Sequence, residues 1–321
     1  MGNLNVAVLG KPGFASRLGK KGTSSDITFY NLKRGDDTVT FIEPTKYPER
    51  LAPLFYAVSI AKMAVLAVEK IDATFGETVL MLHSAGVGSG YIVPLGVMKE
   101  KVAQLVKGTL LEGYEVFEGD VNRLWEKMVS LASQGTSDPA GGEEGGCVAV
   151  DHAFNVKGTG TVVLGTVVQG AVRRHDALRV LPGEKAAQVR SIQKHDDDFE
   201  STFEGDRVGL ALKGVQPEDL DRGALLTNNA SVTTRKELEA EAEIHGYWNE
   251  PLVAGMVVHI GHWMQFVPGR IEEVVVGGGG CRNPKLKVSL GKEMAFIPGS
   301  RGVLMRLEGA KLRVVGSITL T

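Results

Sequence analysis

The chain has 321 residues, of which 43% are hydrophobic, and a formal net charge of −2. The length is typical of two or three domains, and the small net charge excludes a protein that binds nucleic acid or an anionic membrane through its overall charge. No apolar run is long enough for a membrane helix and no basic segment precedes the first apolar run, so we expect a cytoplasmic protein with Cys147 and Cys281 reduced.

Residues 1–135 alternate between strand-like and helix-like patterns. Apolar runs predict strands at 6–9, 27–32, 39–43, 64–69 and 91–94. Apolar residues at helical spacing predict helices at 50–60, 77–85, 98–105 and 121–132. The run AVLAV is continuous enough for a strand buried on both faces. The alternation therefore predicts a mostly parallel sheet with helices on both faces.

The second half of the chain has a different pattern. Residues 136–146 are rich in Gly, Ser, Asp and Pro, and we interpret them as an interdomain linker. Short β-branched runs separated by glycines follow, which predicts two β-barrels, at 147–231 and 232–321. The four glycines at 277–280 interrupt the second barrel and predict a flexible hairpin or loop.

The first predicted strand is followed by glycines in the manner of a phosphate-binding loop. It runs into Gly10, and Gly13 and Gly19 come after it. A phosphate-binding loop of this kind ends in Gly-Lys-Ser or Gly-Lys-Thr, because the lysine neutralises phosphate charge and the hydroxyl binds Mg²⁺. This sequence contains no such ending there, so the loop has the position but not the chemistry of a nucleotide site.

Three stretches of the middle domain resemble one family closely. They are FNVKGTGTVVLGTVVQGAVRRHDALRVLP, EGDRVGLALKGV and DLDRGALLT, which together span about 80 residues. They resemble the second domain of the translational GTPases, such as elongation factor Tu. The resemblance is closer to the selenocysteine-specific elongation factor, and the stretch SIQKHDDDF is also more similar to that factor. The resemblance implies a GTPase-type α/β domain, here short and degenerate, followed by two β-barrels.

The resemblance also shows which nucleotide motifs are altered. Ala15, Ser16 and Arg17 stand where Gly-Lys-Thr is expected, and Ser24 stands at the place of the threonine of the first switch segment. In the place of the motif Asp-x-Pro-Gly, Glu43 replaces the aspartate and Lys46 the glycine, and Gly96–Lys99 replaces the Asn-Lys-x-Asp motif that reads guanine. We call the following residues the nucleotide-site positions: Gly10, Gly13, Ala15, Ser16, Arg17, Ser24, Glu43, Lys46, Gly96 and Lys99.

The nucleotide-site positions lead us to expect no catalytic residues, no GTP or Mg²⁺ cofactor and no enzymatic activity. In the family the second domain receives the aminoacylated end of tRNA, which implies Arg173, Arg174, His195 and Arg207 as candidate contacts. The ordinary alternative for the two adjacent arginines is a pair of solvated turn charges.

Other chemistries have weaker support in the sequence. The acidic run at 195–200 is typical of a solvated turn, although it could bind a metal, and His259 with His262 lacks a matched third ligand. Trp248 and Trp263 are typical of barrel packing, although an exposed indole could stack on a base.

Three hypotheses about function remain open. The first is a GTP-independent relative of the elongation factors that binds tRNA, the ribosome or another translation component. The second is an active GTPase in which Arg17, Lys20 or Lys21 replaces the missing lysine. The third is a regulatory partner of a true elongation factor. No membrane or DNA partner is expected.

Overall fold

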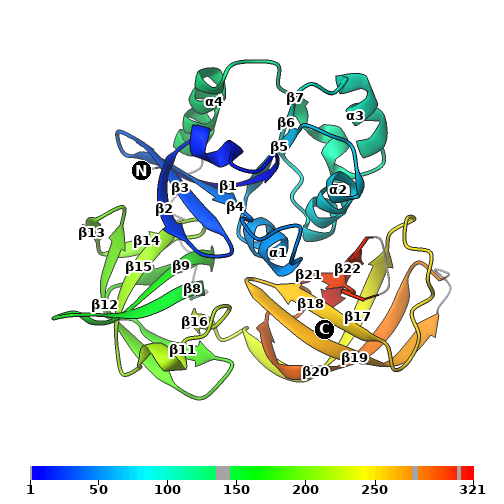
Figure 1. Ribbon diagram of the computed structural model, residues 1–321. Helices are drawn as coiled ribbons and strands as arrows, with labels where there is room; N and C mark the ends of the chain where they lie inside the picture. Colours follow the sequence, from blue (N-terminus) through cyan, green and yellow to red (C-terminus); the bar gives the residue numbers. More distant parts are fainter. Residues whose placement is uncertain (1, 135–144, 277–280, 309–311) are drawn as a thin grey trace.

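The computed structural model describes residues 2–134, 145–276, 281–308 and 312–321, which form an α/β domain and two β-barrels (Figure 1). The three domains meet around a common centre, with the α/β domain above the barrels in this view. Most of the predicted linker and all of the glycine run at 277–280 lie outside the described residues. In the part of the chain described, no helix is long and apolar enough to cross a membrane.

The described residues of the first domain form a seven-stranded sheet in the order β2-β3-β4-β1-β5-β6-β7. The strands are β1 (Asn3–Gly10), β2 (Lys20–Ser24), β3 (Thr28–Arg34), β4 (Asp37–Glu43), β5 (Met63–Val68), β6 (Gly90–Pro94) and β7 (Glu115–Val116). In this order, each strand from β4 through β1, β5 and β6 to β7 is parallel to its neighbours. At the other edge, β3 pairs antiparallel with β4, and β2 pairs antiparallel with β3. The mostly parallel sheet is therefore confirmed, while β2 escaped prediction because its residues are polar and largely exposed.

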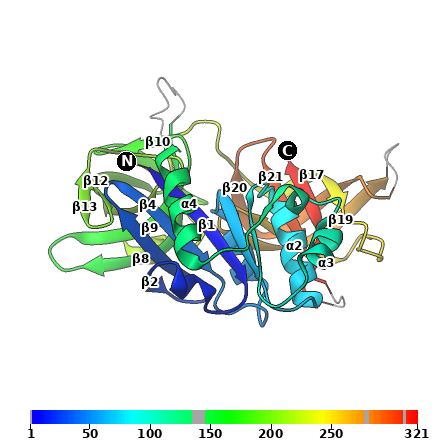
Figure 2. The ribbon, with the colours of Figure 1, turned by 90° about the horizontal axis from the view of Figure 1, so that it is seen from above.

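Helices cover both faces of this sheet, as the alternating pattern predicted. They are α1 (Ala52–Ser59), α2 (Ala73–Ala85), α3 (Lys99–Val106) and α4 (Val121–Gln134). The first three share a core with one face of the sheet, and α4 packs on the other face (Figure 2). Leu124 and Met128 of α4 are buried there. The start of α2 was predicted four residues too late, because the Asp72 side chain caps the helix by accepting from the Phe75 amide.

Between β1 and β2 the chain forms only η1 (Phe14–Arg17), a single turn of 3₁₀ helix. Phe14 and Ala15 of η1 are buried against the sheet, and the chain then continues directly into β2.

The middle domain is a barrel closed by the pairing of β11 with β12. Its strands are β8 (Cys147–Val156), β9 (Gly160–Gln169), β11 (Ala177–Leu181), β12 (Ala186–Lys194), β15 (Arg207–Lys213) and β16 (Leu225–Thr227), with the short β10 (Ala171–Arg173), β13 (Asp197–Phe199) and β14 (Ser201–Phe203) beside them. Cys147 is a buried free thiol, and burial raises its pKa to about 12, which disfavours the reactive thiolate.

The third domain is a closed barrel of antiparallel strands in the order β17-β20-β19-β18-β21-β22. The strands are β17 (Thr233–Ile244), β18 (Val257–His262), β19 (Gln265–Val276), β20 (Pro284–Phe296), β21 (Arg301–Met305) and β22 (Val314–Leu320). Alternating apolar side chains fill its interior, and Trp248 is buried among them, which confirms barrel packing for this residue.

A shared apolar core joins the three domains. Phe29 and Ile42 from the sheet contribute to one buried cluster with Leu225 of the middle barrel and with Met264 and Ala295 of the third. Close packing extends to Gly261, where a Cβ would lie 2.4 Å from the Phe55 ring. The domains are therefore packed directly on one another.

Two buried histidines of the third domain lead us to expect that the stability of the fold decreases at acidic pH. Burial lowers the pKa of both His245 and His262 to about 4. His245 faces His83, Glu243 and Arg301, and His262 Nδ1–H donates to the Arg301 carbonyl (3.1 Å). The unfolded chain takes up protons near pH 6.5 and the folded chain only near pH 4, so stability is full above this window and falls as the pH drops through it.

We expect His262 alone to account for a loss of about 3 kcal/mol by pH 4. Urea unfolding at pH 7 and pH 4 measures the loss, and the His262→Gln variant should show a smaller one. Equal pH dependence in the variant and the wild type would contradict this assignment.

Candidate functional site

The nucleotide-site positions gather at the carboxyl edge of the parallel sheet, as their motifs predict. Gly10 ends β1 with φ 92°, and a Cβ there would lie 2.1 Å from the Ala67 carbonyl oxygen of β5. Gly13 follows with φ 78°. Both backbone conformations are rarely adopted by other residues. The loop thus keeps the close approach of a phosphate-binding loop to its sheet.

Glu43 occupies the concave side of this loop. The Gly13 amide donates to the Glu43 carboxylate at 2.6 Å, and the amides of Phe14 and Ala15 and the Tyr30 hydroxyl also stabilise its charge. Glu43 is only 7% exposed. Burial raises its pKa, and these hydrogen bonds act in the opposite direction. A carboxylate of the chain itself is therefore the partner of the loop amides.

The residues at the remaining loop positions make local contacts. Ser16 Oγ donates to the Gly13 carbonyl at 2.7 Å, and the Arg17 guanidinium lies 5.5 Å from the centre of the Phe14 ring. Ser24 Oγ bonds Thr28 Oγ1 at 2.9 Å, and the Lys46 amide donates to the Asp26 carbonyl at 3.1 Å. The segment between β2 and β3 is thus bonded to the segment that follows β4.

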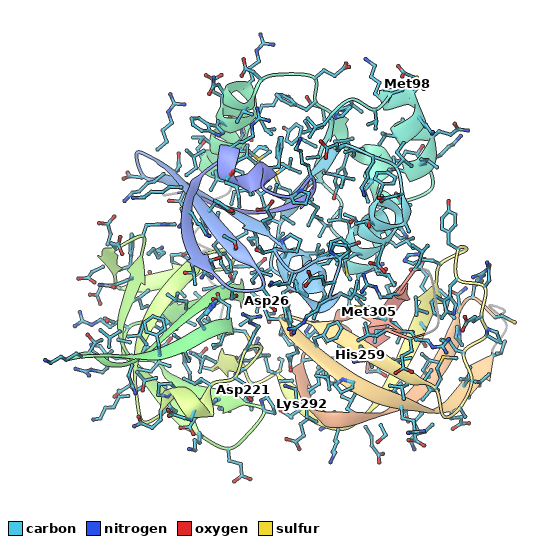
Figure 3. The ribbon with its side chains drawn as sticks, in the orientation of Figure 1. Asp26, Met98, Asp221, His259, Lys292 and Met305 are labelled. Atoms are coloured by element: carbon cyan, nitrogen blue, oxygen red, sulfur yellow. The ribbon has the colours of Figure 1, made fainter. Side chains whose placement is uncertain are left out.

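The positions of the guanine motif face outward. Gly96 adopts φ 88°, and Lys99 forms an exposed ion pair with Glu118 at 2.6 Å. Met98 is 70% exposed and projects from the outer side of the first domain (Figure 3). No carboxylate of the stretch 96–99 is available to pair with a base, because the stretch contains none.

Little space remains beside the loop. The cavity lined by Gly10, Lys11 and the 66–70 segment has a volume of about 50 Å³. Pockets for small molecules and cofactors are usually about 300–1,000 Å³. Lys11 Nζ and Glu69 Oε1 form an ion pair at 2.8 Å at this edge.

A much larger cleft lies between the first domain and the middle barrel. It has a volume of about 1020 Å³ and is lined by η1, β2 and β3 on one side and by β9, β12 and β15 on the other. We call it the interdomain cleft. Of the candidate contacts predicted from the sequence, His195 and Arg207 line this cleft. Arg173 and Arg174 lie at β10 and the following turn, where Arg174 pairs with Glu200 at 2.9 Å.

The interdomain cleft is predominantly basic. Arg17, Lys20 and Lys21 line it, and no ion pair holds any of these three among the described residues. Lys33 also lines it but pairs with Asp197 at 2.7 Å. Burial, together with the charges of Lys33 and Arg207, lowers the pKa of His195 and so disfavours its charged form.

Arg207 braces the two domains that form the cleft. Its guanidinium forms a two-pronged ion pair with the buried Asp151 and lies 3.6 Å from the centre of the Phe29 ring of the first domain. Burial disfavours the Asp151 charge, but Arg207 and His152 hold the pKa of this carboxyl below its usual value. Asp151 and Phe29 were missed from the sequence, because nothing local marks either residue as an arginine partner.

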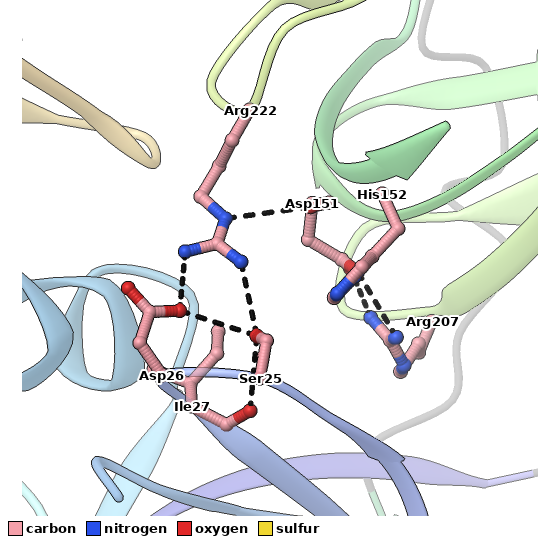
Figure 4. Close-up of polar contacts among 7 residues, drawn as sticks. All are labelled: Ser25, Asp26, Ile27, Asp151, His152, Arg207 and Arg222. Carbon is pink, nitrogen blue, oxygen red and sulfur yellow. Dashed lines mark hydrogen bonds and ion pairs between the residues drawn. The ribbon is translucent and has the colours of Figure 1, made fainter. Parts of the chain in front are cut away.

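A second arginine joins the middle barrel to the switch-like segment (Figure 4). Arg222 pairs with Asp26, donates through Nη2 to Ser25 Oγ at 3.0 Å and through Nε to the Asp151 carbonyl at 3.4 Å. Burial opposes ionisation of Asp26, but the bond and charge of Arg222 lower its pKa overall. Arg222 lies within the DLDRGALLT stretch, so the sequence motif marked the residue but not its contact.

The described residues hold no group of three His, Cys, Asp or Glu side chains placed to bind a metal. His259 stacks near Phe266, with ring centres 5.0 Å apart, and His262 stacks on Trp263 at 4.2 Å. His195 and Asp196 form the turn between β12 and β13, both with positive φ.

Comparison with known proteins places these features in a family. Residues 160–227 match the model of elongation factor Tu domain 2. The protein MJ0325 of Methanocaldococcus jannaschii, itself uncharacterized, is 38% identical over 319 residues, which cover 98% of this chain and 99% of that protein. The selenocysteine-specific elongation factor of the same organism is 41% identical over 123 residues, but these cover only 38% of this chain and 26% of that factor.

Solved structures show the same fold over the whole chain. The elongation factor SelB of Methanococcus maripaludis aligns in its apo form with a TM-score of 0.80 and 23% identity, covering 99% of this chain and 79% of that one. Its complex with the GTP analogue GppNHp aligns with a TM-score of 0.82 and 22% identity, covering 100% and 79%. The chain belongs to the translational GTPase family, with an elongation factor Tu-type second domain and similarity to SelB.

Proposed function

We propose that this chain is a member of the translational GTPase family that binds RNA without a nucleotide. We propose that it holds the end of a tRNA in the interdomain cleft. One observation carries the proposal. The cleft between the first two domains is large and basic, whereas the carboxyl edge of the sheet is nearly filled. The chain has therefore kept space for an RNA ligand and not for a nucleotide.

Three features support the loss of GTP binding and hydrolysis. No lysine stands at the end of the phosphate loop, the loop amides face Glu43, and about 50 Å³ of space remains beside Gly10. A phosphate approaching the loop would meet a buried carboxylate of like charge. Arg17, Lys20 and Lys21 line the interdomain cleft, so nothing favours their use as substitutes for the missing lysine. On this account the protein is not an enzyme and needs neither GTP nor Mg²⁺.

The cleft suits the end of a single RNA strand. Arg17, Lys20 and Lys21 offer cations for phosphates on one wall, and Phe154, which is 40% exposed, offers an aromatic face on the other. Residues 160–227 match elongation factor Tu domain 2, and relatives named as elongation factors are 29%, 33% and 41% identical to this chain over 150, 129 and 123 residues. Because the chain as a whole is nearly neutral, RNA recognition depends on this local patch.

Direct binding tests the RNA partner. The purified chain should bind tRNA, measured by fluorescence anisotropy, with an affinity that falls as salt rises, and should co-sediment with ribosomes if the complex is used there. A protein that binds no tRNA and never co-sediments with ribosomes would refute this part of the proposal.

Calorimetric titration with GTP and GDP in the presence of Mg²⁺ tests the loss of nucleotide binding. We expect no heat of binding at millimolar nucleotide, because the loop amides and the adjacent space are occupied. Binding at micromolar nucleotide would mean that the pocket has been rebuilt with other residues.

A regulatory partner of a true elongation factor is the second candidate function. It is favoured by the exposure of Met98, Leu105 and Leu110, which lie on or beside α3 in the first domain. Analytical ultracentrifugation of the chain with a purified elongation factor separates this candidate from RNA binding.

A further inference from the structure

The contact between Glu43 and the loop has the chemistry of a bound anion. The carboxylate is buried and accepts the Gly13 amide at 2.6 Å, and the amides of Phe14 and Ala15 also face it. Successive backbone amides around a glycine of positive φ form a concave anion site. In a phosphate-binding loop, such amides bind phosphate oxygens. Here the oxygens come from a residue thirty positions further along the chain.

This contact connects three elements of the first domain. Glu43 ends β4, the Tyr30 hydroxyl that stabilises its charge belongs to β3, and the amides belong to Gly13 and to the first two residues of η1. The next residues of η1, Ser16 and Arg17, line the interdomain cleft. A single side chain therefore holds the loop at the sheet edge and, through η1, one wall of the cleft.

The energetics favour a charged acceptor at this point. A buried amide without a partner is costly, and amides bind a carboxylate more strongly than a neutral acceptor. Burial of the Glu43 carboxylate is itself unfavourable and is offset by these same amides. The loop and the carboxylate thus stabilise each other, and removal of the carboxylate takes away the acceptor of the Gly13 amide.

We infer that Glu43 is a built-in anion that takes the place of a bound phosphate group and keeps the loop from Gly10 to Arg17 folded without a ligand. Glu43 would also position Arg17 for RNA at the interdomain cleft, and this second role rests on the proposed function. The role of Glu43 in folding the loop is independent of that function. The site that Glu43 fills is accordingly an oxyanion site of the phosphate type, open to an external anion only when the carboxylate is removed.

Chemical rescue tests this inference on the full chain. The Glu43→Ala variant removes the carboxylate and leaves room for an anion, whereas Glu43→Gln fills the same space without charge. The melting temperature of each is measured in inorganic phosphate and in chloride at equal ionic strength. We expect phosphate to raise the melting temperature of Glu43→Ala by about 3 °C in a saturable manner, and to leave the wild type and Glu43→Gln unchanged.

The Glu69→Ala variant is the matched control, because it removes an exposed carboxylate at the same edge of the sheet. It should show no gain specific to phosphate. An equal effect of phosphate on Glu43→Ala, Glu69→Ala and the wild type would overturn the inference.

Hydrogen exchange provides a second measurement if Glu43→Ala does not fold. The Gly13 amide should exchange at least about tenfold faster in Glu43→Gln than in the wild type, because a neutral acceptor binds it less strongly. Equal exchange rates would overturn the inference. Neither readout involves RNA, so failure of tRNA binding in the wild type would refute the proposed function and leave this assignment standing.

Discussion

Replacement of Glu77 by alanine is expected to lower the free energy of unfolding by about 3–5 kcal/mol. Glu77 lies in α2 and is 3% exposed. It accepts from Arg313 of the third barrel through the backbone amide (2.8 Å), Nε (2.9 Å) and Nη2 (2.6 Å). Its loss leaves a partly buried guanidinium without a carboxylate at the contact between the first and third domains. Urea unfolding at pH 7 measures the change.

An exposed ion pair gives the control for this prediction. Glu200 pairs with Arg174 at the surface, and Glu200→Ala should change the stability by less than about 1 kcal/mol. The double variant of Glu77 and Arg313 to alanine should be less destabilised than the sum of the two single variants, because no charge is left unpaired. Additive effects would show that the two residues do not act as a pair.

Combined replacement of Arg17, Lys20 and Lys21 by alanine is expected to weaken tRNA binding about 100-fold at 0.1 M salt. Loss of three phosphate contacts to a single strand reduces the magnitude of the slope of log affinity against log salt concentration by about 2. At 0.1 M salt, a change of about 2 in this slope corresponds to the expected loss of about 100-fold in affinity. All three side chains are exposed on the cleft wall, so we expect the stability to remain close to that of the wild type. Fluorescence anisotropy across a salt series gives both the affinity and the slope.

A second triple variant separates local from overall charge. Lys101, Lys107 and Arg123 are exposed on the first domain and do not line the interdomain cleft. Their replacement by alanine changes the net charge by the same amount and should alter the affinity much less. Equal losses in the two triple variants would show that RNA binds elsewhere or only through overall charge.

The fold was predictable because its signals are local. Apolar runs such as AVLAV mark buried strands, and the glycine-rich motifs of the middle domain fix turns at defined spacing. The polar strand β2 gave no such signal, since it pairs only at the edge of the sheet. Capping at Asp72 was visible in the sequence and would have corrected the start of α2.

The candidate site was only partly predictable, because its contacts join residues far apart in the chain. The sequence marked Glu43 as an altered motif residue but not its bond to Gly13. It marked Arg207 as a candidate contact, while the structure shows its guanidinium paired with Asp151 and stacked on Phe29. The partner of a long polar side chain depends on how the domains pack, which no local pattern specifies.

The affinity of the nucleotide-free protein for tRNA, measured with and without GTP and Mg²⁺, tests the account most directly. If the chain binds RNA without nucleotide, the two affinities should agree within about twofold, since no coupling free energy links an absent nucleotide site to the cleft. Binding that appears only with GTP, or that strengthens many-fold with it, would contradict the account and restore a nucleotide switch.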